Sequence, residues 1–241
     1  METPLLSVTK INRYFGGLAA VRNFSFDVQV GEAVGLMGPN GAGKTTLINL
    51  IYGVYKPDSG TIKFKGNDIS GLPPHKICHL GIARTYQIPQ PFTTLTALQN
   101  ITVAAIYGRG LRRAAAEDEA VKILDALDLS EKKDMLTQDM DEVALKRLEL
   151  ARVLATRPSL LLIDEVAAGL TEAEIPRILE ILRDIRGTGV AILLIEHVMK
   201  VMTEAVDRII VMDRGEKIAE GKTDDVMKDR KVIEAYLGEA E

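Results

Sequence analysis

The sequence predicts an α/β protein with a mostly parallel central sheet, crossover helices and an inserted helical lobe. Short apolar runs alternate with glycine-rich turns or helical stretches in the first and last thirds of the 241-residue chain. The middle, from about Leu95 to Val153, has helical periodicity instead. The composition, 46% hydrophobic and 27% charged, is that of an ordinary globular protein long enough to bury a large core.

The predicted strands and helices follow one another in a simple order. Strands of the first third are expected at Leu5–Thr9, Phe24–Val30, Ala33–Met37 and Thr61–Phe64. In the middle, one face of an amphipathic helix is formed by Ala120, Val121, Leu124 and Leu127. Strands of the last third are expected at Leu160–Ile163, Ala191–Ile195 and Ile209–Met212. Thr171 and Glu174 predict a capping box ahead of a helix that runs towards Gly187.

Charge and cysteine content exclude several classes of protein. A net charge of −4 argues against a nucleic-acid binder that works by neutralising phosphates. No apolar run approaches the ~18 residues that a membrane span needs, and the first residues lack the pattern of a secretory signal. A single cysteine, Cys78, permits no internal disulfide and suits a reducing cytosol.

A glycine-rich phosphate loop follows the strand expected at Ala33–Met37. The pattern G-x-x-x-x-G-K-[ST] is matched at every fixed position within a segment that consists of Gly38, Pro39, Asn40, Gly41, Ala42, Gly43, Lys44, Thr45 and Thr46. Backbone N–H groups of this loop and the following helix N-terminus are expected to hold phosphates. Lys44 would reach the β- and γ-phosphates, and the Thr45 hydroxyl would ligate Mg²⁺. The sequence therefore predicts a P-loop NTPase fold that binds a nucleoside triphosphate.

Two later strand ends carry side chains suited to hydrolysis. Asp164 ends one buried strand and is expected to hold Mg²⁺ through water. Glu165 comes next, so strand alternation directs its side chain the other way, towards an attacking water. His197 follows the next strand, and ligands of parallel sheets gather at such carboxyl ends.

Taken together, these motifs resemble the nucleotide-binding subunits of ATP-binding cassette (ABC) transporters over nearly the whole chain. Gln87 stands where that family has a glutamine that joins the Mg²⁺ site to the helical lobe. Phe15 stands where an aromatic ring stacks on adenine, with Tyr14 as the alternative one residue away. Residues 168–171 resemble the loop that crosses the dimer interface. Residues 81–92 and 234–238 are similar to the branched-chain amino-acid transport subgroup.

The resemblance implies an architecture and a site. The fold would be a P-loop NTPase of ABC type with an added N-terminal antiparallel β lobe. One ABC ATPase domain would span 1–241, with the core and β lobe at 1–87 and 156–241 and the helical lobe at about 88–155. In the site, Glu165 polarises water, His197 contacts the γ-phosphate, Lys44 stabilises charge, and Gln87 joins Thr45 and Asp164 around Mg²⁺.

The implied function is that of the ATP-hydrolysing subunit of an importer for branched-chain amino acids or related small polar solutes. Its partners would be membrane permease subunits, a second ABC ATPase subunit and, indirectly, a solute-binding protein. Its place would be peripheral, on the cytoplasmic face of the plasma membrane. Two alternatives remain: a soluble ABC ATPase unconnected with transport, and a nucleotide-sensing subunit that hydrolyses ATP weakly.

The family's Leu-Ser-Gly-Gly-Gln-like signature is absent from its expected place. Residues Met140–Ala144 stand there, and the serine, both glycines and the glutamine are missing. Asp141 is expected to cap the next helix as serine would. A carboxylate about 5 Å from a phosphate oxygen costs on the order of 3 kcal/mol at an effective dielectric of ~20. This favours a heterodimer over a homodimer, unless the acidic side chains turn into water and leave the loop a tolerated variant.

Two weaker motifs are interpreted as structural. His75, Cys78 and His79 have no second cluster to complete a four-ligand metal site, and a surface helix after Pro73 is expected there. Residues 68–71 resemble a GTPase D-x-x-G motif without the rest of a guanine site, which indicates a turn.

Overall fold

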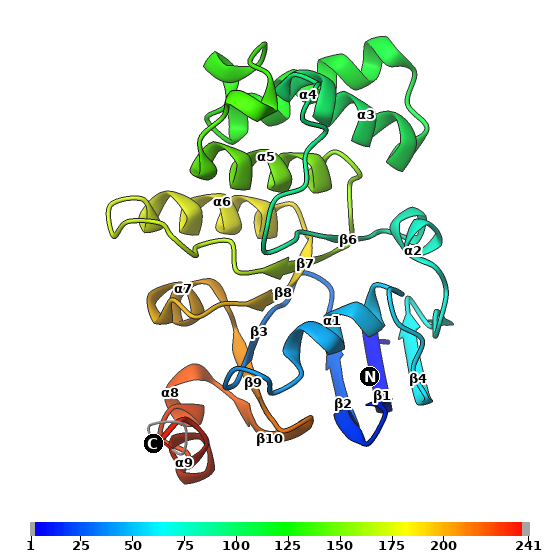
Figure 1. Ribbon diagram of the computed structural model, residues 1–241, viewed down its shortest axis with the longest axis vertical. Helices are drawn as coiled ribbons and strands as arrows, with labels where there is room; N and C mark the ends of the chain where they lie inside the picture. Colours follow the sequence, from blue (N-terminus) through cyan, green and yellow to red (C-terminus); the bar gives the residue numbers. More distant parts are fainter. Residues whose placement is uncertain (1–2, 238–241) are drawn as a thin grey trace.

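The computed structural model describes residues 3–237, which form two β-sheets and an array of helices (Figure 1). The four-stranded sheet is antiparallel, in the order β2-β1-β4-β5, and consists of β1 (Leu6–Phe15), β2 (Leu18–Val28), β4 (Ser59–Phe64) and β5 (Asn67–Asp68). The six-stranded sheet has the order β10-β9-β3-β8-β7-β6, and only its β9–β10 pair is antiparallel. Its strands are β3 (Ala33–Met37), β6 (Ile82–Arg84), β7 (Leu160–Asp164), β8 (Ala191–Ile195), β9 (Arg208–Asp213) and β10 (Glu216–Gly221). The predicted fold class is confirmed.

The helices surround the larger sheet. They are α1 (Lys44–Ile51), α2 (Pro74–Leu80), α3 (Ala97–Arg109), α4 (Arg113–Ala126), α5 (Glu142–Leu154), α6 (Ile175–Gly187), α7 (Met199–Ala205), α8 (Thr223–Val226) and α9 (Arg230–Leu237), with 3₁₀ turns η1 (Ser130–Lys132) and η2 (Thr137–Asp139). Helices α3 to α5 gather at one end of the molecule, and α8 and α9 lie at the opposite end (Figure 1). The sheet between them carries the phosphate-loop strand.

The central sheet is buried on both faces. Alternate residues of β7 belong to different hydrophobic clusters: Leu161 and Ile163 pack with the helices, whereas Leu160 and Leu162 pack with α1 and the antiparallel sheet. Two buried faces require continuous apolar runs, which is why these strands lack polar alternation. The sheet is therefore a rigid platform for groups at its carboxyl edge.

Strands β1 and β2 are longer than the sequence predicts, and β2 also ends earlier. The expected runs were Leu5–Thr9 and Phe24–Val30, whereas the hairpin covers 6–15 and 18–28. Register shifts interrupt the pairing after Val8, and Lys10 has a φ of 48°. A bulge changes which side chains face the core, so simple alternation fails as a guide beyond it.

Only half of the predicted capping box forms, because the Glu174 amide donates to the Thr171 backbone carbonyl and not to its hydroxyl, and the helix begins later than the box implied. The Glu174 carboxylate accepts hydrogen bonds from the Thr171 amide at 2.8 Å and the Thr171 hydroxyl at 2.7 Å. Helix α6 starts only at Ile175, with Pro176 in its first turn. Proline lacks an amide hydrogen and is well tolerated at that position, so it sets the start.

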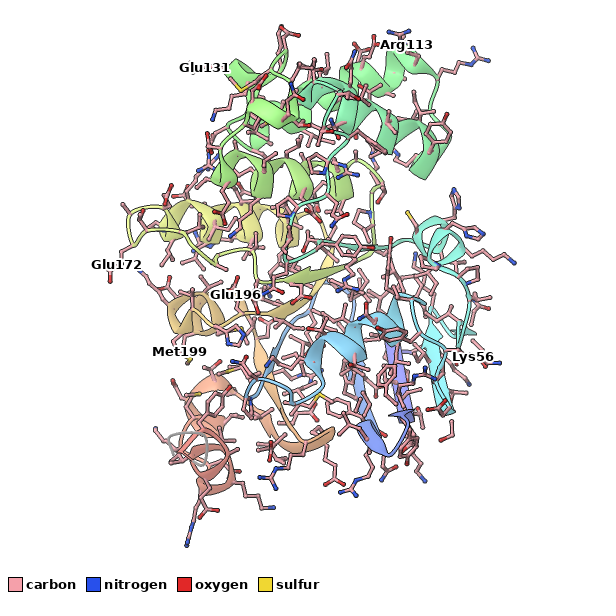
Figure 2. All side chains as sticks on the ribbon, viewed as in Figure 1. Lys56, Arg113, Glu131, Glu172, Glu196 and Met199 are labelled. Atoms are coloured by element: carbon pink, nitrogen blue, oxygen red, sulfur yellow. The ribbon has the colours of Figure 1, made fainter. Side chains whose placement is uncertain are left out.

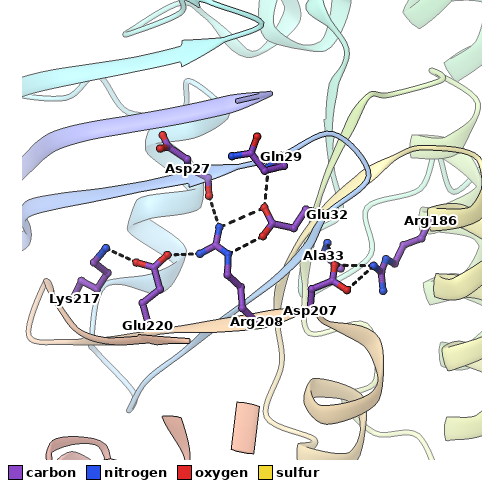
Figure 3. A network of polar contacts seen from close by, with 9 residues as sticks. All are labelled: Asp27, Gln29, Glu32, Ala33, Arg186, Asp207, Arg208, Lys217 and Glu220. Carbon is purple, nitrogen blue, oxygen red and sulfur yellow. Dashed lines mark hydrogen bonds and ion pairs between the residues drawn. The ribbon is translucent and has the colours of Figure 1, made fainter. Parts of the chain in front are cut away.

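A network of charges holds the amino ends of β3 and β9 together (Figure 3). Arg208 donates to the Glu32 carboxylate at 2.7 Å and to the Asp27 carbonyl at 2.6 Å. Next to it, the Asp207 carboxylate accepts a hydrogen bond from the Ala33 amide at 2.9 Å. These contacts lie at the opposite end of the strands from the phosphate loop, so their role is to stabilise the fold.

Replacing Arg208 by methionine is expected to lower the free energy of unfolding by about 2 kcal/mol, because charged hydrogen bonds are lost at a mostly buried place. For a chain of this size the melting temperature falls by about 4–8 °C, and ATP affinity stays unchanged. The matched control is Arg230→Met, which removes a highly exposed ion pair with Glu234 and costs less than about 0.5 kcal/mol. Thermal unfolding of both variants tests this prediction, and an equal fall in melting temperature for the two variants would contradict it.

Candidate functional site

A cleft of about 690 Å³ opens where the phosphate loop meets the carboxyl edge of the larger sheet. The lining includes Phe15, residues 40–46, Gln87, Glu165 and His197. Gly38 and Pro39 contribute carbonyl groups behind the loop, and Asp164 is buried outside this lining. The structure thus gathers the residues singled out in the sequence into one place.

The glycines of the phosphate loop are required by the protein's own backbone. A Cβ at Gly38 would lie 1.9 Å from the Met212 carbonyl oxygen, and one at Gly43 would lie 2.2 Å from that of Ala20. Both glycines also have a positive φ. The absence of side chains at these two positions lets the loop pack closely against β9 and β2.

Lys44 is buried at the first turn of α1. Its ammonium group donates to the carbonyls of Gly38 at 2.6 Å and Pro39 at 2.9 Å. These bonds hold the side chain along the loop, with its charge at the floor of the cleft. A lysine held in this way supplies a fixed cation to phosphate oxygens.

Glu165 is held from two sides by the other predicted residues. Its Oε1 lies 3.1 Å from His197 Nε2, and its Oε2 accepts a hydrogen bond from Gln87 Nε2 at 2.7 Å. Glu165 is mostly buried, whereas about half of the His197 side chain is exposed. The carboxylate therefore has a fixed orientation at the edge of the cleft.

Asp164 and Glu165 diverge for a reason other than the predicted one. Strand β7 ends at Asp164, and Glu165 has a left-handed backbone with a φ of 56°. The Glu165 amide donates to the Ile195 carbonyl at 2.9 Å, which fixes the turn. The turn, rather than strand alternation, sends the two carboxylates to different partners.

The Asp164 carboxylate is 4% exposed and pairs with Arg84 at 3.2 Å. Burial raises the pKa of Asp164, while the Arg84 and Lys44 cations oppose that change. Asp164 ends β7, which β8 separates from the phosphate-loop strand β3, and its carboxylate is a hard oxygen ligand of the kind that divalent metal ions such as Mg²⁺ prefer.

The donor groups present suit Mg²⁺. Thr45 offers a hydroxyl oxygen, Asp164 a carboxylate, and Gln87 an amide whose oxygen is the atom opposite its bond to Glu165. Mg²⁺ is commonly held by one or two carboxylates together with phosphates and waters. Within residues 3–237 no cluster of three or more histidine, cysteine or acidic side chains could hold a metal alone.

Phe15 and Tyr14 differ in their surroundings. Phe15 lines the cleft and packs edge-on against Tyr55, with 5.3 Å between ring centroids. The Arg13 guanidinium lies 4.8 Å from the Phe15 ring centroid. Among the described residues that line the cleft, Phe15 is present and Tyr14 is not. This favours Phe15 over Tyr14 as the residue that would stack on adenine.

Sequence reasoning missed Glu196, which joins two loops of the site. Its buried carboxylate accepts hydrogen bonds from the Ala167 amide at 2.6 Å and from the His197 amide at 3.2 Å. Burial raises the pKa of Glu196. In Figure 2 it lies near the centre of the molecule. The available signal was a glutamate directly after an apolar strand.

The region that replaces the signature keeps its structural role. Asp141 accepts a hydrogen bond from the Ala144 amide at 2.8 Å and so caps α5, as predicted. It also pairs with Lys132, which lowers the pKa of Asp141. Glu142 pairs with Lys146 at 3.3 Å, and Lys146 in turn contacts the Ala168 carbonyl. Both acidic side chains are largely exposed, and each has a lysine beside it.

The surface helix expected after Pro73 forms, and the turn expected at 68–71 forms at Ser70 and Gly71, directly after a short strand. His75, Cys78 and His79 lie on α2, and His79 Nε2 is 3.0 Å from the Tyr107 carbonyl oxygen. Asp68 ends the short β5, where its carboxylate accepts a hydrogen bond from the Ser70 amide at 2.8 Å. Across residues 3–237, the helices are all too short or too polar to cross a bilayer.

Comparison with known proteins gives concordant results. Residues 21–168 match the ABC transporter family, and residues 216–241 match the branched-chain amino acid ATP-binding cassette transporter family. The chain is 37% identical to the high-affinity branched-chain amino acid transport ATP-binding protein LivG of Escherichia coli K12, covering 100% of both chains. It is 36% identical to a probable LivG of Archaeoglobus fulgidus, covering 97% of this chain and 95% of that protein.

A solved structure extends the likeness to three dimensions. An ATP-binding cassette of an ABC transporter, crystallised in its ADP conformation, superposes with a TM-score of 0.88 at 32% identity. The match covers 98% of this chain and 100% of that one. Together with the phosphate loop and the carboxylates at the end of β7, these full-length relatives show that the chain belongs to the ATP-binding cassette family, as an ATPase of the ABC transporter type.

Proposed function

We propose that this ABC ATPase drives the import of branched-chain amino acids or related small polar solutes through partner permeases. The names of the full-length relatives support the solute class. The hydrolytic role rests on one observation: the Glu165 carboxylate is oriented by both Gln87 and His197 beside Lys44. The chain works as one ATPase domain, peripheral to the cytoplasmic face of the membrane, with residues 88–155 as the lobe that meets the permease.

Each cleft residue has a part in this proposal. The phosphate loop and Lys44 bind the triphosphate, Phe15 stacks on adenine, and Glu165 accepts a proton from the attacking water. His197 contacts the γ-phosphate while its bond to Glu165 steadies the carboxylate. Thr45, Asp164 and Gln87 would hold Mg²⁺, which neutralises phosphate charge when bound. Gln87 touches Glu165 directly, so movement of the helical lobe reaches the hydrolytic group.

Reconstitution tests the proposal. The chain is combined in vesicles with its permease subunits, a second ABC ATPase subunit and a solute-binding protein, and uptake of labelled leucine is measured with ATP inside. ATP-dependent leucine uptake that disappears with Glu165→Gln is the expected result. ATP hydrolysis without uptake of any amino acid, and without co-purification of a permease, would favour the soluble ATPase alternative instead.

We further propose that the working complex contains a second, related ATPase subunit. The exposed Asp141 and Glu142 stand where the family presents a serine and glycine to ATP held by the opposite subunit. Lys132 and Lys146 reduce the repulsion but do not replace the missing hydroxyl and glycine backbone. A partner with a full signature completes the site at this chain's phosphate loop.

Restoring the signature is expected to raise the activity of the isolated chain. The triple variant Asp141→Ser, Glu142→Gly and Val143→Gly removes two carboxylates and a bulky side chain, and Ser keeps the α5 cap. We expect turnover by the isolated chain to rise at least about tenfold, equivalent to about 1.4 kcal/mol of barrier. Glu131→Ser, at an exposed acidic position on η1, is the control and leaves turnover unchanged. A wild-type chain that is as active alone as with any partner subunit would contradict the heterodimer.

A further inference from the structure

Arg84 is a buried cation that the proposed chemistry leaves unassigned. It ends β6, beside β7 in the sheet, and its side chain is 4% exposed. Its Nη2 donates to Asp164 Oδ2 at 3.2 Å, and its Nη1 contacts the Asn49 side-chain oxygen on α1. Burying a charged side chain costs free energy unless it is paired, so the position of Arg84 calls for a structural or functional explanation.

The guanidinium joins three parts of the site. Asn49 belongs to the helix that begins at the phosphate loop, and Asp164 ends β7, which β8 separates from the phosphate-loop strand β3. The Arg84 Cζ also lies 4.8 Å from the ring centroid of Tyr86, the residue before Gln87. The planar fork of an arginine fixes the directions of its hydrogen bonds, which a lysine cannot do.

A further hydrogen bond connects Tyr86, whose ring lies beside the Arg84 guanidinium, to the helical lobe. The Tyr86 amide donates to the Glu149 carboxylate of α5 at 2.6 Å, and Glu149 is itself buried. Tyr86 is therefore fixed by α5 through its backbone, while its ring covers Arg84. The arginine cannot shift without disturbing either its ring contact or its two hydrogen bonds.

The bond to Arg84 occupies one oxygen of Asp164. With Oδ2 held by Arg84, the carboxylate is restricted to one rotamer, and Oδ1 is the oxygen left for a metal ion. Groups that orient a metal-ligating carboxylate from behind contribute strongly, since their loss weakens metal affinity by about 10–100-fold.

We propose that Arg84 is a positioning residue that fixes the Asp164 carboxylate for the divalent cation bound with ATP. The proposal rests on the proposed role of Asp164 as a metal ligand. Arg84 touches neither nucleotide nor water in this role and acts only through Asp164. It therefore sets the affinity for the metal and leaves metal-free nucleotide binding to the phosphate loop and Lys44.

The proposal is tested by measuring metal binding to the full chain, an experiment that does not depend on ATP hydrolysis. Mn²⁺ is titrated in the presence of a non-hydrolysable ATP analogue and followed by electron paramagnetic resonance. Nucleotide affinity is measured separately with a fluorescent ATP analogue in EDTA. For Arg84→Met we expect Mn²⁺ half-saturation to rise at least about tenfold, with metal-free nucleotide affinity within about twofold of wild type. Arg84→Lys retains the charge without the planar fork, so its Mn²⁺ half-saturation should lie between those of wild type and Arg84→Met.

Arg152→Met is the matched control. Like Arg84, Arg152 has its guanidinium beside an aromatic ring, at 5.3 Å from the Phe92 centroid. Its hydrogen bond goes to the Gln90 carbonyl at 2.6 Å and not to Asp164. Its loss should leave Mn²⁺ half-saturation unchanged. If Arg84→Met fails to fold by circular dichroism, Arg84→Lys decides the question in the same titration.

The outcomes distinguish failure of the Arg84 proposal from failure of the proposal that Asp164 is a metal ligand. Asp164→Asn weakens Mn²⁺ binding if Asp164 is a ligand, and an unchanged value would refute that role. If Asp164→Asn weakens binding while folded Arg84 variants keep wild-type affinity, only the Arg84 proposal fails. Tighter Mn²⁺ binding in Arg84→Met would also overturn it, because the arginine would then compete with the metal.

Discussion

Replacing Lys44 by alanine is expected to reduce ATP turnover by at least about a thousandfold, near 4 kcal/mol of transition-state stabilisation. The ammonium group lies at the floor of the cleft and is held by the Gly38 and Pro39 carbonyls. Its loss removes the main cation from the β- and γ-phosphates, where charge develops during transfer. Steady-state phosphate release and equilibrium ATP binding measure the two parts of this effect.

The control for this variant is Lys56→Ala. Lys56 is an exposed lysine at the edge of the molecule, labelled in Figure 2. It should keep wild-type turnover and ATP affinity. Wild-type turnover in Lys44→Ala would defeat the assignment of the phosphate loop, whatever the control shows.

Replacing Glu165 by glutamine should lower turnover by about 10²–10⁴-fold while ATP remains bound, because a positioned general base is lost. Glutamine has the same shape and can still accept from Gln87 and meet His197, so the site keeps its geometry. ATP held without cleavage should also prolong the ATP-bound dimer. Single-turnover hydrolysis, nucleotide retention and size-exclusion chromatography with ATP measure these effects.

Glu172→Gln is the matched control, since Glu172 is an exposed glutamate in the same loop and is labelled at the left edge of the molecule in Figure 2. It should hydrolyse ATP normally. Normal hydrolysis by Glu165→Gln would mean that another group accepts the proton, and His197 would then be the first residue to test.

The strands and the phosphate loop could be predicted because local sequence determines them. Ala33–Met37 was placed correctly to the residue, since a run buried on both faces is apolar throughout and ends at a glycine loop. Glu165 and His197 could be predicted to lie at one edge of the sheet, because the carboxyl ends of parallel strands share that edge. Their distance of 3.1 Å confirms that reasoning.

Other features depend on contacts between distant residues and left no local signal. Nothing near Arg84 in the sequence indicates that it pairs with Asp164, eighty residues later in the chain. Nor does the periodicity around Glu149 show that it will accept a bond from the Tyr86 amide. The start of α6 at Ile175 was misplaced because the capping pair and Pro176 give competing signals, and the proline prevailed.

The left-handed backbone of Glu165 sets stability against activity. A residue with a Cβ in that conformation costs about 1–2 kcal/mol relative to the right-handed form, a cost that glycine avoids. Glycine at 165 would relieve this backbone cost, but it would also remove the carboxylate's contacts with Gln87 and His197 and the group that accepts the proton, so relief of the strain comes only with loss of ATP cleavage. Engineering for thermostability must therefore exclude this position and look for its gains elsewhere in the molecule.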